Sequence, residues 1–188
     1  MVSLENTTMV KACVTVLVVV VVGSLAQQDS SGSCPRPGSE GSELCPGAGE
    51  QETLVCPDPY FPLGDRCYWI PDATRQMEDS HVYCAVREPD GYTARLAVLD
   101  DCPSFAAVAD YVASTLKTET SYWVGGTDLF EEDRWFWINK AEVVRGAPFW
   151  ETGQPDGGTK ENNLILNHRG RLEDRHPSEL LPFICQLK

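Results

Sequence analysis

The residues best suited to ligand chemistry are oxygen-bearing side chains within residues 154–174: Gln154, Asp156, Glu161, Glu173 and Asp174. Amide and carboxylate oxygens are the ligands of a hard cation such as calcium, which takes about six to eight of them. Pro155 can be held in the cis form in an ordered loop, which would turn the two flanking side chains toward the same side. On composition alone, however, an acidic stretch is better explained as solvated surface.

The amino terminus has the pattern of a secretory signal peptide. Lys11 precedes a valine-rich apolar run over residues 12–25, and Ala26 follows small residues suited to cleavage. The run is short for a membrane span, although Glu5 before the single positive charge leaves an uncleaved anchor as an alternative. We expect a signal peptide over 1–26 and a secreted, extracellular protein.

The formal net charge of −13 limits the classes of partner. Such acidity argues against nucleic acid and against attraction to anionic membranes. It is compatible with a protein that binds divalent cations, or with one that simply stays soluble. We therefore expect no nucleic-acid partner and no membrane insertion.

The cysteines predict a disulfide framework. Of the eight, Cys13 lies in the expected signal peptide, so an odd number remains in an oxidising compartment. No CxxC pair or Cys/His cluster favours zinc. At least one thiol is therefore free, capped or linked to another chain. Cys102 could pair with Cys34 or Cys45, or it could bridge two chains, and the sequence leaves both open.

Composition divides the rest of the chain into a leader and one domain. Residues 27–53 are rich in Ser, Gly, Glu and Pro and predict a flexible leader. Residues 54–188 are long enough for one core. They begin with a hairpin pattern that Cys56 and Cys67 could staple.

Helices and strands are expected in succession along the domain. Helices are predicted over 74–87 and 103–117, the second with Asp101 as a cap and Pro103 in its first turn. Between them, residues 95–99 form a short extended run. Strands are expected at 122–126, 135–138, 163–166 and 182–185.

Residues 139–162 contain no convincing regular element. A loop of that length inside a compact domain is usually functional, and this one contains Gln154-Pro155-Asp156. The tryptophans at 123, 135 and 137 could be imagined as sugar-stacking platforms, but strand spacing favours their burial in the core.

These motifs, in this order, resemble the C-type lectin domain. Those that carry the likeness are Trp123-Val124-Gly125-Gly126, Gln154-Pro155-Asp156 and Pro182-Phe183-Ile184-Cys185. Among such domains the chain is similar to secreted single-domain lectins of invertebrates, of the arthropod type. The resemblance implies an α+β fold in which two helices flank small antiparallel sheets and a long irregular loop binds the ligand. It also implies the disulfides Cys56–Cys67 and Cys84–Cys185.

The resemblance implies a calcium site that also holds sugar. Its metal and carbohydrate ligands would be Gln154, Asp156, Glu161, Glu173 and Asp174, with two sugar hydroxyls completing the shell of the ion. In the family, Gln-Pro-Asp accompanies an axial 4-hydroxyl, as in galactose. A second metal site could use Asp128, Glu132, Glu161 and Asn162.

The sequence departs from the family pattern in four respects. Leu172-Glu173-Asp174 replaces the usual Trp-Asn-Asp. Asn163 and Pro177 stand where a pair of cysteines would staple the loop, so we expect calcium to help order it. Gly157 replaces an expected acidic ligand of the second site. With Gly158, it also replaces the aromatic residue that often stacks on galactose.

The sequence therefore favours a secreted, calcium-dependent carbohydrate-binding lectin that recognises microbial surface glycans in innate immunity. Agglutination would require oligomerisation, which stays open. The alternative is a lectin-like domain that has lost sugar binding and recognises a protein partner. An enzyme is not expected, since no Gly-x-Ser-x-Gly elbow occurs and the carboxylates are better explained as sharing one cation.

Overall fold

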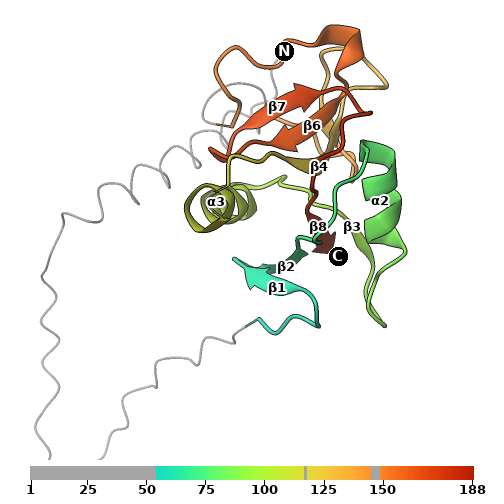
Figure 1. The fold of residues 1–188 in the computed structure, drawn as a ribbon, viewed down its shortest axis with the longest axis vertical. Coiled ribbons are helices and arrows are strands. Elements are labelled where there is room, and N and C mark those ends of the chain that lie inside the picture. The colour runs from blue at the N-terminus through green and yellow to red at the C-terminus, as the bar shows by residue number, and fades with distance from the viewer. Residues whose placement is uncertain (1–53, 117, 145–148) are drawn as a thin grey trace, which may run out of the picture.

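The computed structural model describes residues 54–116, 118–144 and 149–188, which form two four-stranded sheets and two α-helices (Figure 1). The strand orders are β1-β2-β8-β3 and β5-β4-β6-β7. The expected α+β fold is confirmed. The predicted signal peptide and leader, residues 1–53, lie outside the described residues, and no helix within the described part is long and apolar enough to cross a bilayer.

The first sheet joins both ends of the domain. Strands β1 (Phe61–Leu63) and β2 (Arg66–Trp69) form the expected hairpin, with Phe61 opposite Tyr68. The Cys56–Cys67 disulfide closes it. The last strand, β8 (Cys185–Leu187), lies between β2 and β3 (Ala94–Leu96).

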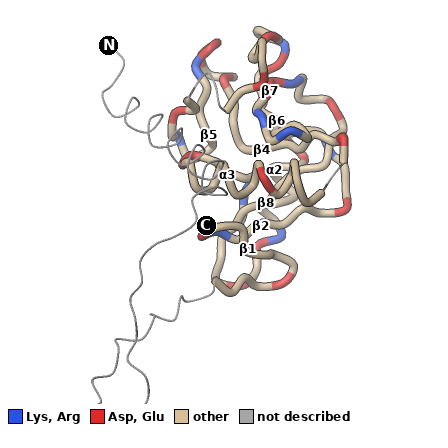
Figure 2. Tube along the Cα trace, turned by 90° about the vertical axis from the view of Figure 1, so that its left-hand side faces the viewer, with Lys and Arg blue, Asp and Glu red and all other residues tan. Residues whose placement is uncertain are grey.

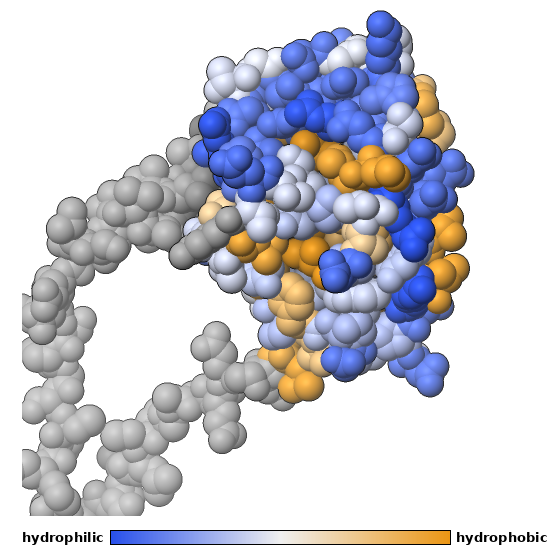
Figure 3. All heavy atoms as spheres, in the orientation of Figure 1, coloured by the Kyte–Doolittle hydropathy of each residue, from blue (hydrophilic) through white to orange (hydrophobic). Residues whose placement is uncertain are grey.

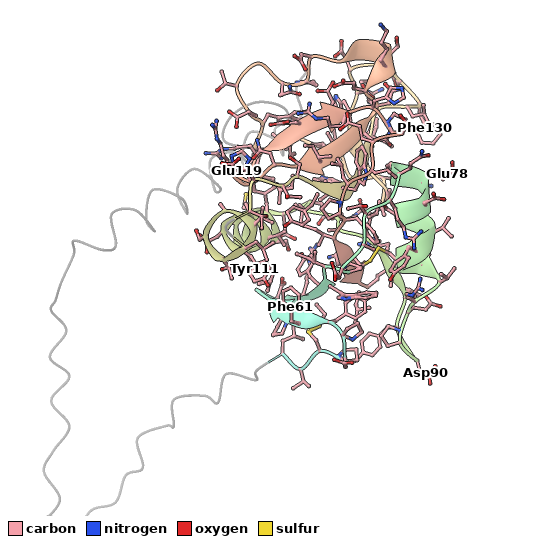
Figure 4. All side chains as sticks on the ribbon, in the orientation of Figure 1. Phe61, Glu78, Asp90, Tyr111, Glu119 and Phe130 are labelled. Atoms are coloured by element: carbon pink, nitrogen blue, oxygen red, sulfur yellow. A yellow bond between two sulfur atoms is a disulfide. The ribbon has the colours of Figure 1, made fainter. Side chains whose placement is uncertain are left out.

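Helix α3 (Cys102–Asp110) begins as its sequence predicts. The Asp101 carboxylate accepts a hydrogen bond from the Ser104 backbone N–H at 2.8 Å, and a proline occupies the first turn. The helix continues as a π-helical segment, η1 (Tyr111–Leu116), in which Tyr111 packs on Phe61 with ring centroids 5.1 Å apart (Figure 4).

Helix α2 (Met77–Ala85) packs on the opposite side of the molecule from α3 (Figure 1). The Cys84–Cys185 disulfide ties α2 to β8 across 101 residues, as the resemblance implies. Cys102 is disulfide-bonded as well. Its two expected partners, Cys34 and Cys45, lie outside the described residues.

The second sheet is built around β4 (Tyr122–Thr127). Its neighbours are β5 (Phe136–Trp137) and β6 (Asn163–Leu166), and β7 (Leu172–Arg175) pairs with β6. A Cβ on Gly126 would lie 2.4 Å from Leu164, so this glycine lets β4 and β6 pack closely. The three tryptophans of this region are in the core, as expected: Trp123 in β4, Trp135 just before β5 and Trp137 in β5 are each at most 3% exposed.

Two strand predictions differ from the structure. Strand β7 was not expected, because Leu-Glu-Asp-Arg contains no β-branched or aromatic residue and no alternation of apolar with polar residues. The expected strand at 182–185 pairs regularly only from Cys185 onward. Pro182 has no N–H to donate to a ladder, and only its carbonyl is used, by Trp123 at 2.9 Å.

Candidate functional site

Three predicted ligands meet beyond the end of the second sheet. Asp156 in the long loop, Glu161 after the short η2 helix (Gly158–Lys160) and Asp174 on β7 each offer one carboxylate oxygen, all within 4.8 Å of one another. We call these three residues the carboxylate cluster. Their burial differs, since Asp174 is 1% exposed whereas Asp156 lies at the surface.

Hydrogen bonds hold the loop against β7. The Gln154–Pro155 peptide bond is cis, and the Gln154 Nε2 donates to Asp156 at 2.8 Å. The Gln154 Oε1 accepts from the Asp174 backbone N–H at 3.2 Å. In return, the two Asp174 oxygens accept from the backbone N–H groups of Asp156 at 3.1 Å and Gly157 at 2.8 Å. These four hydrogen bonds fix Asp156 and Asp174 relative to each other.

Gly157 makes room for Glu161. A Cβ placed on Gly157 would lie 2.2 Å from the Glu161 Cβ and 2.3 Å from its Cγ. Because the Cβ cannot move away by side-chain rotation, any other residue at 157 would shift the backbone. Gly157 stands where the family pattern has an acidic ligand. The same glycine therefore gives the Glu161 side chain room to fold over the loop.

The carboxylates of the cluster repel one another. Burial and the nearby charge of Asp174 raise the pKa of Glu161, and the positive charge of Arg175 offsets part of that rise. A cluster of this kind is stabilised when a cation neutralises it. Its three members offer only carboxylate oxygens, which fit a hard cation such as calcium.

A second group of oxygens lies beside the first. Asp128 is 3% exposed, and its Oδ1 has no hydrogen-bond partner among the described residues; the same holds for the Oδ1 of Asn162. The two residues are neighbours, since the Asp128 N–H donates to the Asn162 carbonyl at 3.3 Å. Buried polar atoms without a partner are rare and usually mark an ion or water.

The charges around Asp128 are mostly of one sign. Burial raises the pKa of Asp128, and the carboxylates of Asp133 and Asp174 add to the rise. Local desolvation and the carboxylates of Asp128, Asp133 and Asp174 raise the pKa of the exposed Glu132. Glu161 precedes Asn162 in the chain, and the Glu132 Oε1 would lie 3.8 Å from a Cβ on Gly158, so Glu132 lies near the same segment. Carboxylate and amide oxygens of this kind are the donors that a hard cation takes.

Glu173 lies apart from the carboxylate cluster. On β7 it alternates with Asp174, so the two side chains leave the strand in opposite directions. One Glu173 oxygen accepts from the Asn167 amide and the other pairs with Arg175, both at 2.6 Å. The structure therefore shows no cluster contact for this predicted ligand. It shows a neutralised pair that the sequence analysis missed, because it depends on an unpredicted strand.

The surface around the site is polar. The loops beyond β6 and β7 present a mostly hydrophilic face in Figure 3. Basic positions accompany the acidic ones there (Figure 2). Such a surface suits a hydrated, polyhydroxylated ligand better than an apolar one.

Comparison with known proteins identifies the family. The family model "Lectin C-type domain" matches residues 73–187. The chain is 24% identical over 135 residues to the human "C-type lectin domain family 17, member A", covering 72% of this chain but only 33% of that protein. It is also 24% identical over 139 residues to a C-type lectin of Micrurus corallinus, covering 72% of this chain and 85% of the relative.

A solved structure gives the same result. The C-type lectin domain of murine dendritic cell inhibitory receptor 2, in complex with an N-glycan, aligns with a TM-score of 0.58 and 26% identity, covering 71% of this chain and 99% of that one. This chain belongs to the C-type lectin family. Neither its resemblance to arthropod lectins nor its ligand follows from these matches.

Proposed function

We propose that this protein is a calcium-dependent carbohydrate-binding lectin. The observation that carries the proposal is the carboxylate cluster of Asp156, Glu161 and Asp174, which the loop and β7 bring within 4.8 Å. Calcium bound there would supply the positive charge to which two neighbouring sugar hydroxyls coordinate. The chain's own part is to hold these oxygens in place and to accept hydrogen bonds from the hydroxyls. Family membership supports the proposal, as does the murine relative described in complex with an N-glycan.

The proposal includes finer points of metal and sugar. Gln154 and Glu173 are proposed as further ligands, Glu173 after release from Arg175. A second ion is proposed at Asp128, Glu132, Glu161 and Asn162, because one buried oxygen of Asp128 and one of Asn162 have no hydrogen-bond partner in the part of the chain that the structure describes. The Gln154-Pro155-Asp156 order favours a galactose-type sugar.

The biological setting is proposed from the sequence. A secreted lectin that recognises glycans on microbial surfaces in innate immunity would be consistent with the signal pattern. Affinity for one sugar is expected on the order of millimolar, because few contacts oppose the cost of association. Agglutination would then require a homo-oligomer, through which avidity multiplies affinity.

The first experiment measures binding of the secreted chain to galactose and mannose resins, with calcium and with a chelator. We expect retention on galactose that the chelator abolishes. Retention that survives chelation would overturn the calcium proposal. No retention on either resin, followed by no binding to a panel of other immobilised glycans, would overturn the carbohydrate proposal.

A double substitution tests the sugar preference. Gln154→Glu with Asp156→Asn exchanges the amide and the carboxylate across the loop while keeping the oxygens. We expect the preference to move toward mannose, because the donors and acceptors for the two hydroxyls change places. An unchanged preference would show that these residues do not select the sugar.

A second candidate function has one observation in its favour. Glu173 is already bonded to Asn167 and Arg175, so the site has one ligand fewer in this arrangement. A lectin-like domain that recognises a protein would have no need of that ligand. Calcium titration by calorimetry discriminates the two, since the protein-binding alternative predicts no calcium binding at the cluster.

A further inference from the structure

The predicted ligands of the long loop lie on residues 154–161, which we call the ligand segment, and Glu151 holds the chain just before it. The Glu151 carbonyl accepts a hydrogen bond from the Gln154 N–H at 3.1 Å. Gln154 in turn bonds to Asp156 and to the backbone of Asp174. The position of Glu151 therefore determines where the ligand segment begins relative to β7.

Every hydrogen-bonding group of Glu151 is in use. Its backbone N–H donates to the Leu172 carbonyl at 3.0 Å. Its Oε1 accepts from the Thr152 N–H at 3.0 Å, and its Oε2 accepts from the Asn167 Nδ2 at 3.1 Å. Arg169 approaches Oε2 only to 3.8 Å, with a side chain that is 68% exposed. Because an exposed ion pair contributes little, Asn167 is the main support of this carboxylate from outside the loop.

Asn167 directly follows β6 and is a fully bonded amide that is only 3% exposed. Its Oδ1 accepts from the backbone N–H groups of Arg169 and Arg171, both at 2.9 Å. Its Nδ2 donates to Glu151 and also to the Oε1 of Glu173 at 2.6 Å. A side-chain amide has two donor hydrogens and two acceptor lone pairs, so these four bonds use all of them.

The two bonds of Nδ2 are more than the β6–β7 turn requires. An asparagine that only stabilised the turn would use its oxygen, which bonds to the turn backbone here. The Nδ2 instead joins the turn to Glu151 on one side and to Glu173 on the other. An aspartate at 167 could keep the turn but would place a third carboxylate between these two.

We propose that Asn167 is a positioning residue for the ligand segment: through Glu151 it holds the beginning of that segment, and with it Asp156, against β7 before any cation is bound. This inference rests on the proposed function, because the segment carries the proposed calcium ligands. The hydrogen bond takes the place of the disulfide that Asn163 and Pro177 do not provide. Calcium then meets oxygens that are already close together, so less of its binding free energy is needed to order the loop.

Hydrogen exchange of the metal-free protein tests this role. Asn167→Asp keeps the size of the side chain and its acceptor, but it repels Glu151 and Glu173. We expect the N–H groups of Gln154 and Gly157 to exchange about tenfold to hundredfold faster than in the wild type, the range for a lost hydrogen bond to a charged group. Calcium affinity, measured by calorimetry, should fall about tenfold.

Two exchanges of amide and carboxylate show which bond of Nδ2 matters. Glu151→Gln combined with Asn167→Asp reverses the direction of the loop bond, because the introduced amide donates to the introduced carboxylate. This pair should restore slow exchange of the ligand segment and most of the calcium affinity. Glu173→Gln combined with Asn167→Asp restores only the bond to β7, so the ligand segment should exchange as fast as in Asn167→Asp.

A single variant keeps the test decisive if Asn167→Asp does not fold. Glu151→Gln leaves one oxygen to serve both Thr152 and Asn167, so one of the two bonds is lost. The Glu151 side chain is 25% exposed, which makes the change mild for the fold. The ligand segment should still exchange faster, and an unchanged rate would contradict the role of this bond.

Asn139 offers a matched control in another part of the domain. Its Nδ2 donates to an Asp100 carboxylate oxygen at 2.6 Å, and its Oδ1 accepts from the Ala141 N–H at 3.0 Å. Asn139→Asp therefore introduces a similar repulsion, and among the described residues no hydrogen bond of Asn139 reaches the ligand segment. It should lower the melting temperature without speeding exchange in the ligand segment or weakening calcium binding.

The outcomes separate this inference from the proposed function. A wild type that binds neither calcium nor sugar would overturn the proposed function, whereas exchange without calcium still measures what Asn167 does to the loop. If Asn167→Asp leaves the ligand segment as protected as in the wild type, or if Asn139→Asp exposes it equally, the positioning role is wrong. The same holds if the pair with Glu173→Gln, rather than the pair with Glu151→Gln, restores the protection.

Discussion

Glu161 and Asn162 are consecutive residues that belong to two different groups of oxygens. Glu161 completes the carboxylate cluster, whereas Asn162, next to Asp128, presents an oxygen that has no hydrogen-bond partner among the described residues. The short η2 helix that precedes them determines where both side chains lie. A change of backbone in this segment should therefore affect both proposed ion positions.

Gly157→Ala tests the packing of this segment at the scale of one residue. The added Cβ would lie 2.2 Å from the Cβ of Glu161, which must move out of the cluster. We expect calcium affinity to fall by about 10-fold to 100-fold, the range for lost positioning of a ligand. Calorimetric titration measures it, with Thr159→Ala in the exposed part of the same loop as control. An unchanged affinity would show that the loop adapts.

Asp128→Asn tests the second group, and its effect should change sign with calcium. Without calcium, the substitution removes a buried charge with an unpartnered oxygen, so we expect a gain of about 1 kcal/mol in the free energy of unfolding. With calcium, it removes an anionic ligand, so we expect the free energy of unfolding to fall below that of the calcium-loaded wild type. Denaturant unfolding with and without calcium measures both. Equal effects in the two conditions would contradict a second ion position.

At the scale of elements, the sequence could predict those parts of the fold whose local patterns are strong. The cap at Asp101 and the helical spacing after it predict α3, and turn residues between apolar runs predict the first hairpin. Strand β7 could not be predicted, because its residues are polar and it is stabilised by pairing with β6. The Glu173–Arg175 pair depends on that strand, since only a strand places residues two apart on one face.

The two described disulfides should differ in their contribution to stability. Cys84–Cys185 closes 101 residues and Cys56–Cys67 closes 11. The chain-entropy relation predicts losses of about 4.7 and about 2.8 kcal/mol when each pair is replaced by alanine. Chemical denaturation measures the difference. A larger loss for the short bridge would show that packing around it matters more than the length of the loop.

At the scale of the whole molecule, pH should act oppositely on the metal-free and calcium-loaded states. The pKa values of Asp128, Glu132 and Glu161 are raised in the fold. Acidification through these raised values therefore makes these three groups favour the metal-free fold, because the folded state then binds more protons at them than the unfolded one. The lowered pKa values of Asp100 and Glu151 act in the opposite direction. The same protons compete with calcium for the oxygens.

We therefore expect the rise in melting temperature on adding calcium to be large near pH 7 and to shrink toward about pH 5. Thermal unfolding at each pH, with calcium and with chelator, measures the difference. The triple variant Asp128→Asn, Glu132→Gln, Glu161→Gln is the control and should show little calcium effect at either pH. A calcium effect that is independent of pH would contradict the role of these three carboxylates.

The sheet β1-β2-β8-β3 contains both the first and the last strand, and it lies at the opposite end of the molecule from the loops beyond β6 and β7 (Figure 1). Anything joined to either end of the domain would therefore attach behind the proposed site. A fluorophore or surface anchor coupled after Lys188 should leave the ligand loop facing the solution. Several copies fixed side by side through these ends would present their sites in one direction. Such an arrangement would allow multivalent binding to a densely glycosylated surface.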